Sequence, residues 1–187
     1  MRAFLALNLD GELRERLHRD TAALRAAAPD ATWVRAENLH LTLKFLGDVD
    51  PPHARLLADT LQATVARHPV IQATLAGAGA FPDLRRPRVI WIGARDQSAL
   101  KALAADVDRA CAAAGFPPEA RPFSAHVTLG RVKRPLGRDA AGALASAAHA
   151  VAASYPVRLG SVDLMQSELA PGGSRYSVVA SLPLGSA

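Results

Sequence analysis

One four-residue phrase occurs twice in this chain, and it carries the residues best suited to do chemistry. HLTL occupies residues 40–43, and HVTL occupies residues 126–129, 86 positions later. Along a β-strand every second side chain points the same way, so each His shares a face with its Thr. The spacing therefore predicts two strands that each bury an aliphatic face and display an imidazole and a hydroxyl on the other.

Paired imidazoles indicate acid–base catalysis. Histidine titrates near neutral pH, so two of them can supply one acid and one base together. In-line cleavage of a phosphodiester needs one group to activate the attacking oxygen and another to protonate the leaving oxygen. His40 and His126 are the candidates for these two roles, and the hydroxyls of Thr42 and Thr128 are candidate donors to a phosphate.

Two cations follow the motifs closely. Lys44 shares a face with residues 40 and 42 under strict alternation, which makes it a candidate phosphate ligand. Arg131 has the forked donors that suit phosphate. Strict alternation points Arg131 away from His126, so its participation requires a bulge or a strand end near Gly130.

A structural role and a metal site are the competing interpretations of these histidines. A single His on a half-buried strand is more often structural than catalytic, but the repetition of the whole motif favours function. The remaining histidines lie on predicted helices or at their ends, where surface or capping roles are expected: His18, His53, His68 and His149. Zinc needs three or four ligands, and the motif histidines have no third partner nearby in the sequence. We expect neither a metal nor another cofactor.

The order of predicted elements indicates a duplicated unit. Strands are expected near 3–9, 39–46, 70–76, 88–94, 124–132, 157–166 and 175–184, and helices at 11–27, 52–67, 97–114 and 138–152. Each half contains one His-x-Thr strand followed by a helix. We expect an α+β fold in which two antiparallel sheets, flanked by helices, face each other across a central cleft. Residues 1–187 would form a single bilobal domain.

Composition sets the class of partner and compartment. The chain has 187 residues, and 22 Lys or Arg against 17 Asp or Glu give a net charge of +5, which favours anionic partners. Cys111 is the only cysteine, which excludes an intramolecular disulfide and fits the reducing cytoplasm. No apolar run approaches the ~20 residues that span a bilayer, so we expect no membrane association.

The segments HLTLKFLGDV (40–49) and HVTLGRV (126–132) resemble the paired signatures of the two-histidine phosphoesterase superfamily. The closest likeness is to its RNA 2′,3′-cyclic phosphodiesterase family, also described as 2′-5′ RNA ligase-like. The likeness extends to RAFLA (2–6), to RVIW (88–91) and to a closing hairpin over 164–184 that includes Ser167, Gly173 and Tyr176. It implies a bilobal α+β fold with both motifs lining a central cleft.

The resemblance also implies an activity and roles for individual residues. The activity is metal-independent hydrolysis of RNA terminal 2′,3′-cyclic phosphates to 2′-phosphates. His40 would protonate the departing 3′-oxygen and His126 would activate water, although the sequence allows the reverse assignment. Thr42, Thr128 and Arg131 would hold the phosphate.

Phe45 has two interpretations. Strand alternation sends it to the aliphatic face, where it would be a core residue. The family resemblance instead places Phe45 at the rim of the cleft, packed against the substrate base.

Two other functions remain open. One is a related phosphodiesterase or 2′-5′ RNA-joining enzyme with another substrate, such as ADP-ribose cyclic phosphate or tRNA halves. The other is a non-catalytic module that binds RNA ends, which the intact histidines and threonines argue against. The expected partners are RNA ends with a 2′,3′-cyclic phosphate, tRNA fragments among them, bound by a monomer.

Overall fold

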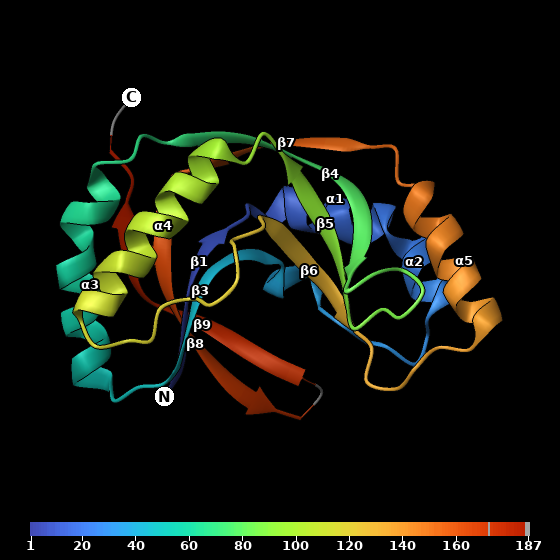
Figure 1. Ribbon diagram of the computed structural model, residues 1–187, viewed down its shortest axis with the longest axis horizontal. Helices are drawn as coiled ribbons and strands as arrows, with labels where there is room; N and C mark the ends of the chain where they lie inside the picture. Colours follow the sequence, from blue (N-terminus) through green and yellow to red (C-terminus); the bar gives the residue numbers. More distant parts are fainter. Residues whose placement is uncertain (172, 186–187) are drawn as a thin grey trace.

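The computed structural model describes residues 1–171 and 173–185, and its strands form one curled antiparallel sheet (Figure 1). The strands are β1 (Arg2–Asn8), β2 (Thr32–Trp33), β3 (His40–Asp48), β4 (Ile71–Phe81), β5 (Val89–Arg95), β6 (His126–Arg131), β7 (Ser154–Leu159), β8 (Ser161–Ala170) and β9 (Gly173–Pro183). The helices are α1 (Gly11–Asp20), α2 (Ala22–Ala27), the 3-10 turn η1 (Ala36–Asn38), α3 (Pro51–Ala66), α4 (Ser98–Ala113) and α5 (Arg138–His149).

The sheet has two equivalent halves that meet at the motif strands. Its order is β7-β4-β5-β6-β3-β1-β8-β9, and the short β2 pairs with β6. We call β3, β1, β8 and β9 the His40 half, and β6, β5, β4 and β7 the His126 half. The two halves join where Leu41 of β3 pairs with Val127 of β6. The predicted α+β duplication is therefore present, but the expectation of two separate sheets is wrong, because the two central strands pair with each other.

The two repeats exchange elements across this junction. Strand β4 follows β3 and α3 in sequence but lies in the His126 half, and β8 follows β7 but pairs with β1 in the His40 half. Helices α3 and α4 pack together beside the His40 half, whereas α2 and α5 pack together beside the His126 half (Figure 1). Each half is thus completed by the other repeat.

Several elements differ from the predicted ones: β4 continues to Phe81, five residues beyond its expected end at residue 76, and neither β2 nor η1 was expected. The expected strand over 157–166 is two strands, because the chain leaves the edge of the His126 half at Gly160 and enters the His40 half. The expected helix over 11–27 is interrupted at Thr21. The buried Thr21 hydroxyl donates to the carbonyl of Leu17 at 2.7 Å, which competes with the helical backbone bonds.

Helix caps in the sequence fix the elements beside the motifs. The Asp10 carboxylate accepts the backbone N–H of Leu13 at 2.7 Å and begins α1. Asp50 accepts the N–H of His53 at 3.1 Å, and Pro51 occupies the first turn of α3, as the Asp-Pro pair predicts. Among the described residues, no helix has both the length and the apolar character that crossing a membrane requires.

Candidate active site

The two motifs lie side by side on one face of the sheet, which we call the motif face. Leu41 and Val127 pair directly, are fully buried, and point away from this face. In an antiparallel pair, the register around them puts His40 and His126 on a diagonal of the motif face. Diagonal neighbours of this kind are about 7–8 Å apart, which leaves room for a phosphate between the rings.

His40 is held on three sides. Its Nδ1–H donates to the backbone carbonyl of Asn38 at 2.7 Å, since a carbonyl can only accept. Its Nε2 lies 3.0 Å from the hydroxyl of Thr42. The rings of Phe4 and Tyr176 pack against the imidazole, with centroids at 5.0 and 5.4 Å. The ring is thereby fixed in the tautomer that leaves a lone pair on Nε2.

His126 repeats this arrangement. Its Nδ1–H donates to the carbonyl of Ser124 at 2.7 Å, again two residues before the histidine. The rings of Phe81 and His126 pack in a T-shaped arrangement, with 5.0 Å between their centroids. Phe81 in turn contacts Trp91, whose indole lies over Gly79 so closely that an added Cβ there would come within 2.6 Å of two ring carbons. Both histidines therefore offer Nε2 for proton transfer.

Each motif strand contains a β-bulge, and the bulge changes the face of the sheet to which the residue five places after the histidine points. In β3, Thr42 pairs with Ala6 and Lys44 with Leu5, so Leu43 is skipped. In β6, Thr128 pairs with Trp91 and Gly130 with Ile90, so Leu129 is skipped. A bulge adds one residue and reverses the alternation beyond it. Residues 45 and 131 therefore return to the motif face.

Phe45 and Arg131 are both exposed there. The Phe45 side chain is 61% exposed, and its ring centroid lies 6.1 Å from that of Phe4, which also packs on His40. The interpretation of Phe45 as a core residue is therefore wrong. The bulge that Arg131 required is present at Leu129.

Lys44 lies on the opposite face, so the expectation that it joins the phosphate site is wrong. Its ammonium donates to Asp108 of α4 at 2.6 Å and to the carbonyl of Pro117 at 2.7 Å, and the residue is 3% exposed. The bulge at Leu43 is the cause. Lys44 ties the motif strand to α4 and to the segment that leads toward His126.

Burial lowers the pKa of both motif histidines. For His40, desolvation is the main cause and outweighs the opposing hydrogen bond to Asn38; the charges of Arg14, Arg131 and His126 lower the pKa further. For His126, desolvation again leads, and the charge of Arg131 adds to it. One guanidinium therefore acts on both rings, and both imidazoles are held toward their neutral form.

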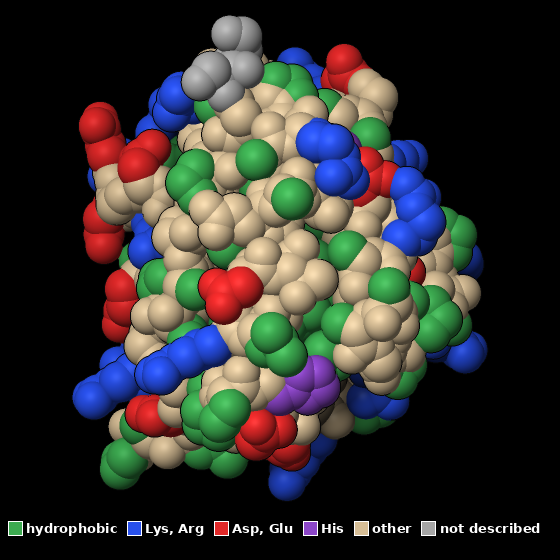
Figure 2. Space-filling model, turned by 90° about the vertical axis from the view of Figure 1, so that its left-hand side faces the viewer, with side chains coloured by type: hydrophobic (Ala, Val, Ile, Leu, Met, Phe, Trp, Pro, Cys, Tyr) green, Lys and Arg blue, Asp and Glu red, His purple; other side chains and the backbone are tan. Residues whose placement is uncertain are grey.

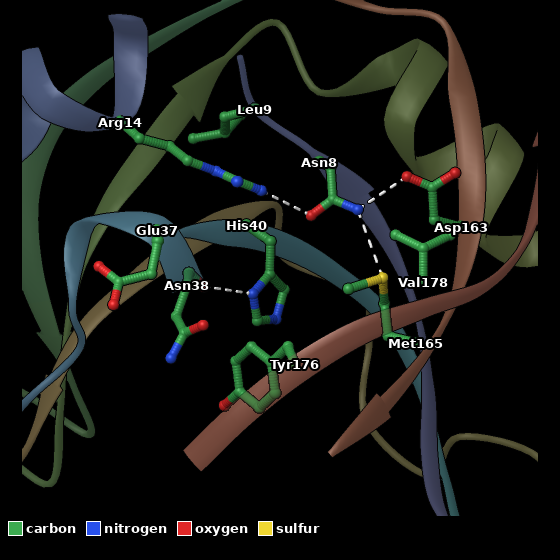
Figure 3. Close-up of a pocket in the computed structure, with 10 residues that line it drawn as sticks. All are labelled: Asn8, Leu9, Arg14, Glu37, Asn38, His40, Asp163, Met165, Tyr176 and Val178. Carbon is green, nitrogen blue, oxygen red and sulfur yellow. Dashed lines mark hydrogen bonds between the residues drawn. The ribbon is translucent and has the colours of Figure 1, made fainter. Parts of the chain in front are cut away.

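A cavity of about 310 Å³ opens beside His40 (Figure 3). Its wall is a chain of polar groups: Arg14 donates to Asn8 at 2.8 Å, and Asn8 donates to the buried Asp163 at 2.7 Å. Tyr176 closes another side. Sequence reasoning missed this wall. The signal that could have found it is Asp163, an acid inside the apolar run VDLM of a predicted strand.

Within residues 1–171 and 173–185, no three His, Cys, Asp or Glu side chains gather at one point. The polar groups that the two motifs and Arg131 bring to the motif face are two imidazoles, two hydroxyls and one guanidinium.

The sequence matches a family model. The model, described as LigT like Phosphoesterase, matches residues 7–91 and again 92–176. Each match contains one His-x-Thr motif, which agrees with the duplication of the fold.

Curated relatives and solved structures are similar over nearly the whole chain. An RNA 2′,3′-cyclic phosphodiesterase of Methanothermobacter thermautotrophicus is 36% identical over 177 residues, covering 95% of each chain. The Escherichia coli protein of the same description is 34% identical over 178 residues, covering 94% of this chain and 92% of that one. A crystal structure from Thermus thermophilus superposes with a TM-score of 0.75 at 28% identity, covering 100% and 99%. Escherichia coli LigT in its apo form gives 0.70 at 30% identity, covering 98% and 97%.

Proposed function

The chain belongs to the LigT-like phosphoesterase family, and on that premise we propose that it is an RNA 2′,3′-cyclic phosphodiesterase. The hydrolysis converts the terminal cyclic phosphate to a 2′-phosphate. The observation that carries the proposal is the placement of both His-x-Thr motifs on one face, with each Nδ1–H bonded to a carbonyl so that Nε2 is the nitrogen left for proton transfer. The names of the similar proteins give the substrate class.

In the proposed reaction, a water oxygen attacks phosphorus in line with the bond to the 3′-oxygen. His126 Nε2 takes the proton of that water as the new P–O bond forms. His40, protonated at Nε2, gives its proton to the 3′-oxygen as the P–O3′ bond breaks. The products are a 2′-phosphate and a free 3′-hydroxyl, and proton exchange with solvent restores the two rings.

The phosphate is held by the remaining polar groups of the motif face. Thr42 and Thr128 donate hydroxyl hydrogen bonds to its oxygens, and Arg131 supplies charge and forked donors. Negative charge placed between the rings favours their protonated forms, which raises the pKa of the acid at the moment when it must carry a proton. Phe45 stacks on the terminal base without reading its identity.

Hydrolysis of nucleoside 2′,3′-cyclic phosphates tests the proposal. The wild-type protein is expected to yield only the 2′-monophosphate, which phosphorus NMR distinguishes from the 3′-isomer. Exclusive formation of the 3′-isomer would reverse the assignment of the broken bond. Binding without turnover would point to an RNA-end-binding module. Turnover only with ADP-ribose cyclic phosphate, or joining of tRNA halves without hydrolysis, would place the chain elsewhere in the superfamily.

We also propose that residues 1–187 act as one bilobal unit, as a monomer in the cytoplasm. The exchange of β4 and β8 between the halves supports the first part, because neither repeat completes a half by itself. The lone, buried Cys111 is compatible with a reducing compartment.

A further inference from the structure

Two loops beside the motif face hold the whole excess of positive charge. Residues 82–88 (PDLRRPR) and 131–138 (RVKRPLGR) contain seven Lys or Arg and a single carboxylate, Asp83. The rest of the chain then has 15 Lys or Arg against 16 Asp or Glu, whereas the chain as a whole carries +5. We call these two loops the basic rim.

The two loops of the basic rim touch near Arg88, and all of their cations are exposed. Val132 N–H donates to the carbonyl of Arg88 at 2.9 Å, and the Arg88 guanidinium donates to the carbonyl of Lys133 at 3.3 Å, so the two loops lie against each other. Every Lys and Arg of the rim is exposed: Arg85, Arg86, Arg88, Arg131, Lys133, Arg134 and Arg138. The opposite end of the molecule, around α3, shows acidic and basic side chains mixed (Figure 2).

The 82–88 loop is held in shape rather than extended into solvent. One Asp83 carboxylate oxygen accepts the backbone N–H groups of Arg85 and Arg86 at 2.8 and 2.9 Å. These three residues line a hollow of about 270 Å³. The turn fixes the backbone and leaves both guanidinium groups available to a ligand.

The basic rim is continuous with the motif face. Strand β6 runs from His126 to Arg131, where the rim begins, and Arg131 pairs with Val89 next to Arg88. At ~3.3 Å per residue, the rim starts about 16 Å from the histidine. The charge of Arg131 lowers the pKa of both motif histidines, so the same group belongs to the reaction centre and to the rim.

We propose that the basic rim binds the phosphates of single-stranded RNA on the 5′ side of the reacting terminus. This inference rests on the proposed function and adds to it the surface that holds the RNA strand beyond its terminal nucleotide. The rim contains no Phe, Tyr or Trp, so it offers charge but no ring for stacking. Binding there depends on the backbone and on salt, and not on base sequence.

The test compares a nucleoside 2′,3′-cyclic phosphate with a 10-nucleotide RNA that ends in the same cyclic phosphate. The variant is Arg85→Gln with Arg86→Gln, which leaves Arg131 in place. The matched control is Arg55→Gln with Lys101→Gln, which removes two exposed charges from α3 and α4. KM is measured for both substrates between 0.05 and 0.5 M salt.

For the oligonucleotide, the wild-type protein should show a KM that rises with salt. Each lost phosphate contact reduces the slope of log KM against log salt by about 0.7, so the rim variant should lose about 1.4. Across the tenfold range of salt, the KM of the wild type should therefore rise roughly 25-fold more than the KM of the rim variant. The mononucleotide KM should not change, and the control variant should behave as wild type.

The inference would be overturned by equal KM values for both substrates in the wild type, by an oligonucleotide KM that the rim variant leaves unchanged, or by an equal loss in the control. An equal loss for both substrates would also overturn it, since the effect would then come from the reaction centre. If the wild type hydrolyses neither substrate, the proposed function fails. In that case, salt-independent binding of a 2′-phosphorylated oligonucleotide, measured by fluorescence anisotropy, would overturn the rim inference separately.

Discussion

His40 and His126 hold the same tautomer, because each donates its Nδ1–H to the carbonyl of the residue two positions earlier. Asn38 and Ser124 are those residues. Both rings therefore meet a substrate through Nε2, and neither can turn without losing a 2.7 Å hydrogen bond. Because both rings present the same nitrogen, the substrate oxygen that lies beside each ring decides which ring acts as the acid and which as the base.

The first prediction concerns the loss of either ring. His40→Ala and His126→Ala should remain folded and lose ~10²–10⁴-fold in kcat for a nucleoside 2′,3′-cyclic phosphate, the usual scale for a general acid or base. The double variant should be little worse than either single one, because a concerted step already fails without one partner. Circular dichroism and steady-state kinetics measure both parts.

An activated leaving group separates the two roles. A 3′-deoxynucleoside 2′-(p-nitrophenyl phosphate) keeps the ester to the 2′-oxygen and releases p-nitrophenolate in place of the 3′-oxygen, and this leaving group needs no proton. If His40 is the acid, His40→Ala should regain most of its activity on that substrate while His126→Ala should not. Recovery by His126→Ala alone would exchange the two assignments, and near-normal turnover by a folded variant on the cyclic substrate would rule out the two-histidine mechanism.

The second prediction is the position of the pH profile. Burial and the charge of Arg131 lower the pKa of both histidines in the free enzyme. The acidic limb of kcat/KM reports the base losing its proton and the alkaline limb reports the acid losing its proton, so both limbs should lie below about pH 6.5. The kcat profile should lie at higher pH, because bound phosphate raises the pKa of both rings.

Arg131→Gln provides the check. Removing the positive charge should raise both histidine pKa values and move the kcat/KM profile toward alkaline pH. Arg131→Lys keeps the charge and should keep the profile while raising KM, because the fork is lost. An unchanged profile in Arg131→Gln would show that the charge of Arg131 does not lower either pKa.

The sequence predicts the motif strands, the duplication and most helices, because these depend on local periodicity and capping. It does not predict the face of residues 44, 45 and 131. Each lies beyond a bulge at Leu43 or Leu129, and both leucines look like ordinary strand residues. A bulge is set by the pairing of a strand with its neighbour, which one strand's own pattern does not contain. The bulge at Leu129 brings Arg131 to the motif face, and the equivalent bulge at Leu43 does the same for Phe45.

Long-range pairing also explains the two other differences. The union of both halves in one sheet depends on the Leu41–Val127 contact between strands that are 86 residues apart. The wall of the cavity beside His40 joins Arg14, Asn8 and Asp163 from three separate elements. Neither arrangement has a local sequence signature.

The third prediction is that activity survives chelation. Exhaustive dialysis against EDTA should leave kcat/KM unchanged, because the proposed proton transfers and phosphate contacts use only side chains of the motif face. A parallel sample with added Zn²⁺ or Mn²⁺ should gain nothing. Inactivation by the chelator, followed by recovery on adding either ion, would require a metal in the mechanism.

The fourth prediction concerns the base. Stacking on an aromatic ring contributes ~1–3 kcal/mol per base. Phe45→Ala should therefore raise KM for nucleoside cyclic phosphates roughly 5- to 150-fold, with a smaller change in kcat and little preference among bases. The side chain is 61% exposed, so the melting temperature should change little. Leu56→Ala removes a side chain that is 63% exposed on α3 and is the matched control. A large stability loss with unchanged KM would exclude the stacking role.

The last prediction tests the reversal of alternation at Leu43. Lys44 is buried and bonded to Asp108, so Lys44→Met leaves that carboxylate without its cation. Removing one partner of a buried pair costs ~3–5 kcal/mol, and Asp108 keeps some access to water, which favours the lower part of that range. At 2–4 °C per kcal/mol for a chain of this size, the melting temperature should fall by roughly 6–12 °C. Kinetics on nucleoside cyclic phosphates should stay within about threefold of wild type, since no part of Lys44 faces the substrate.

The double variant Lys44→Met with Asp108→Asn should recover part of the lost stability, because it removes the unpaired charge. If Lys44 instead bound the phosphate, Lys44→Met would show the opposite pattern: an unchanged melting temperature and a large rise in KM. That outcome would restore strict alternation along β3 and would return Phe45 to the core. The bulge at Leu43 therefore links the placement of Lys44 to that of Phe45, and one pair of measurements decides both.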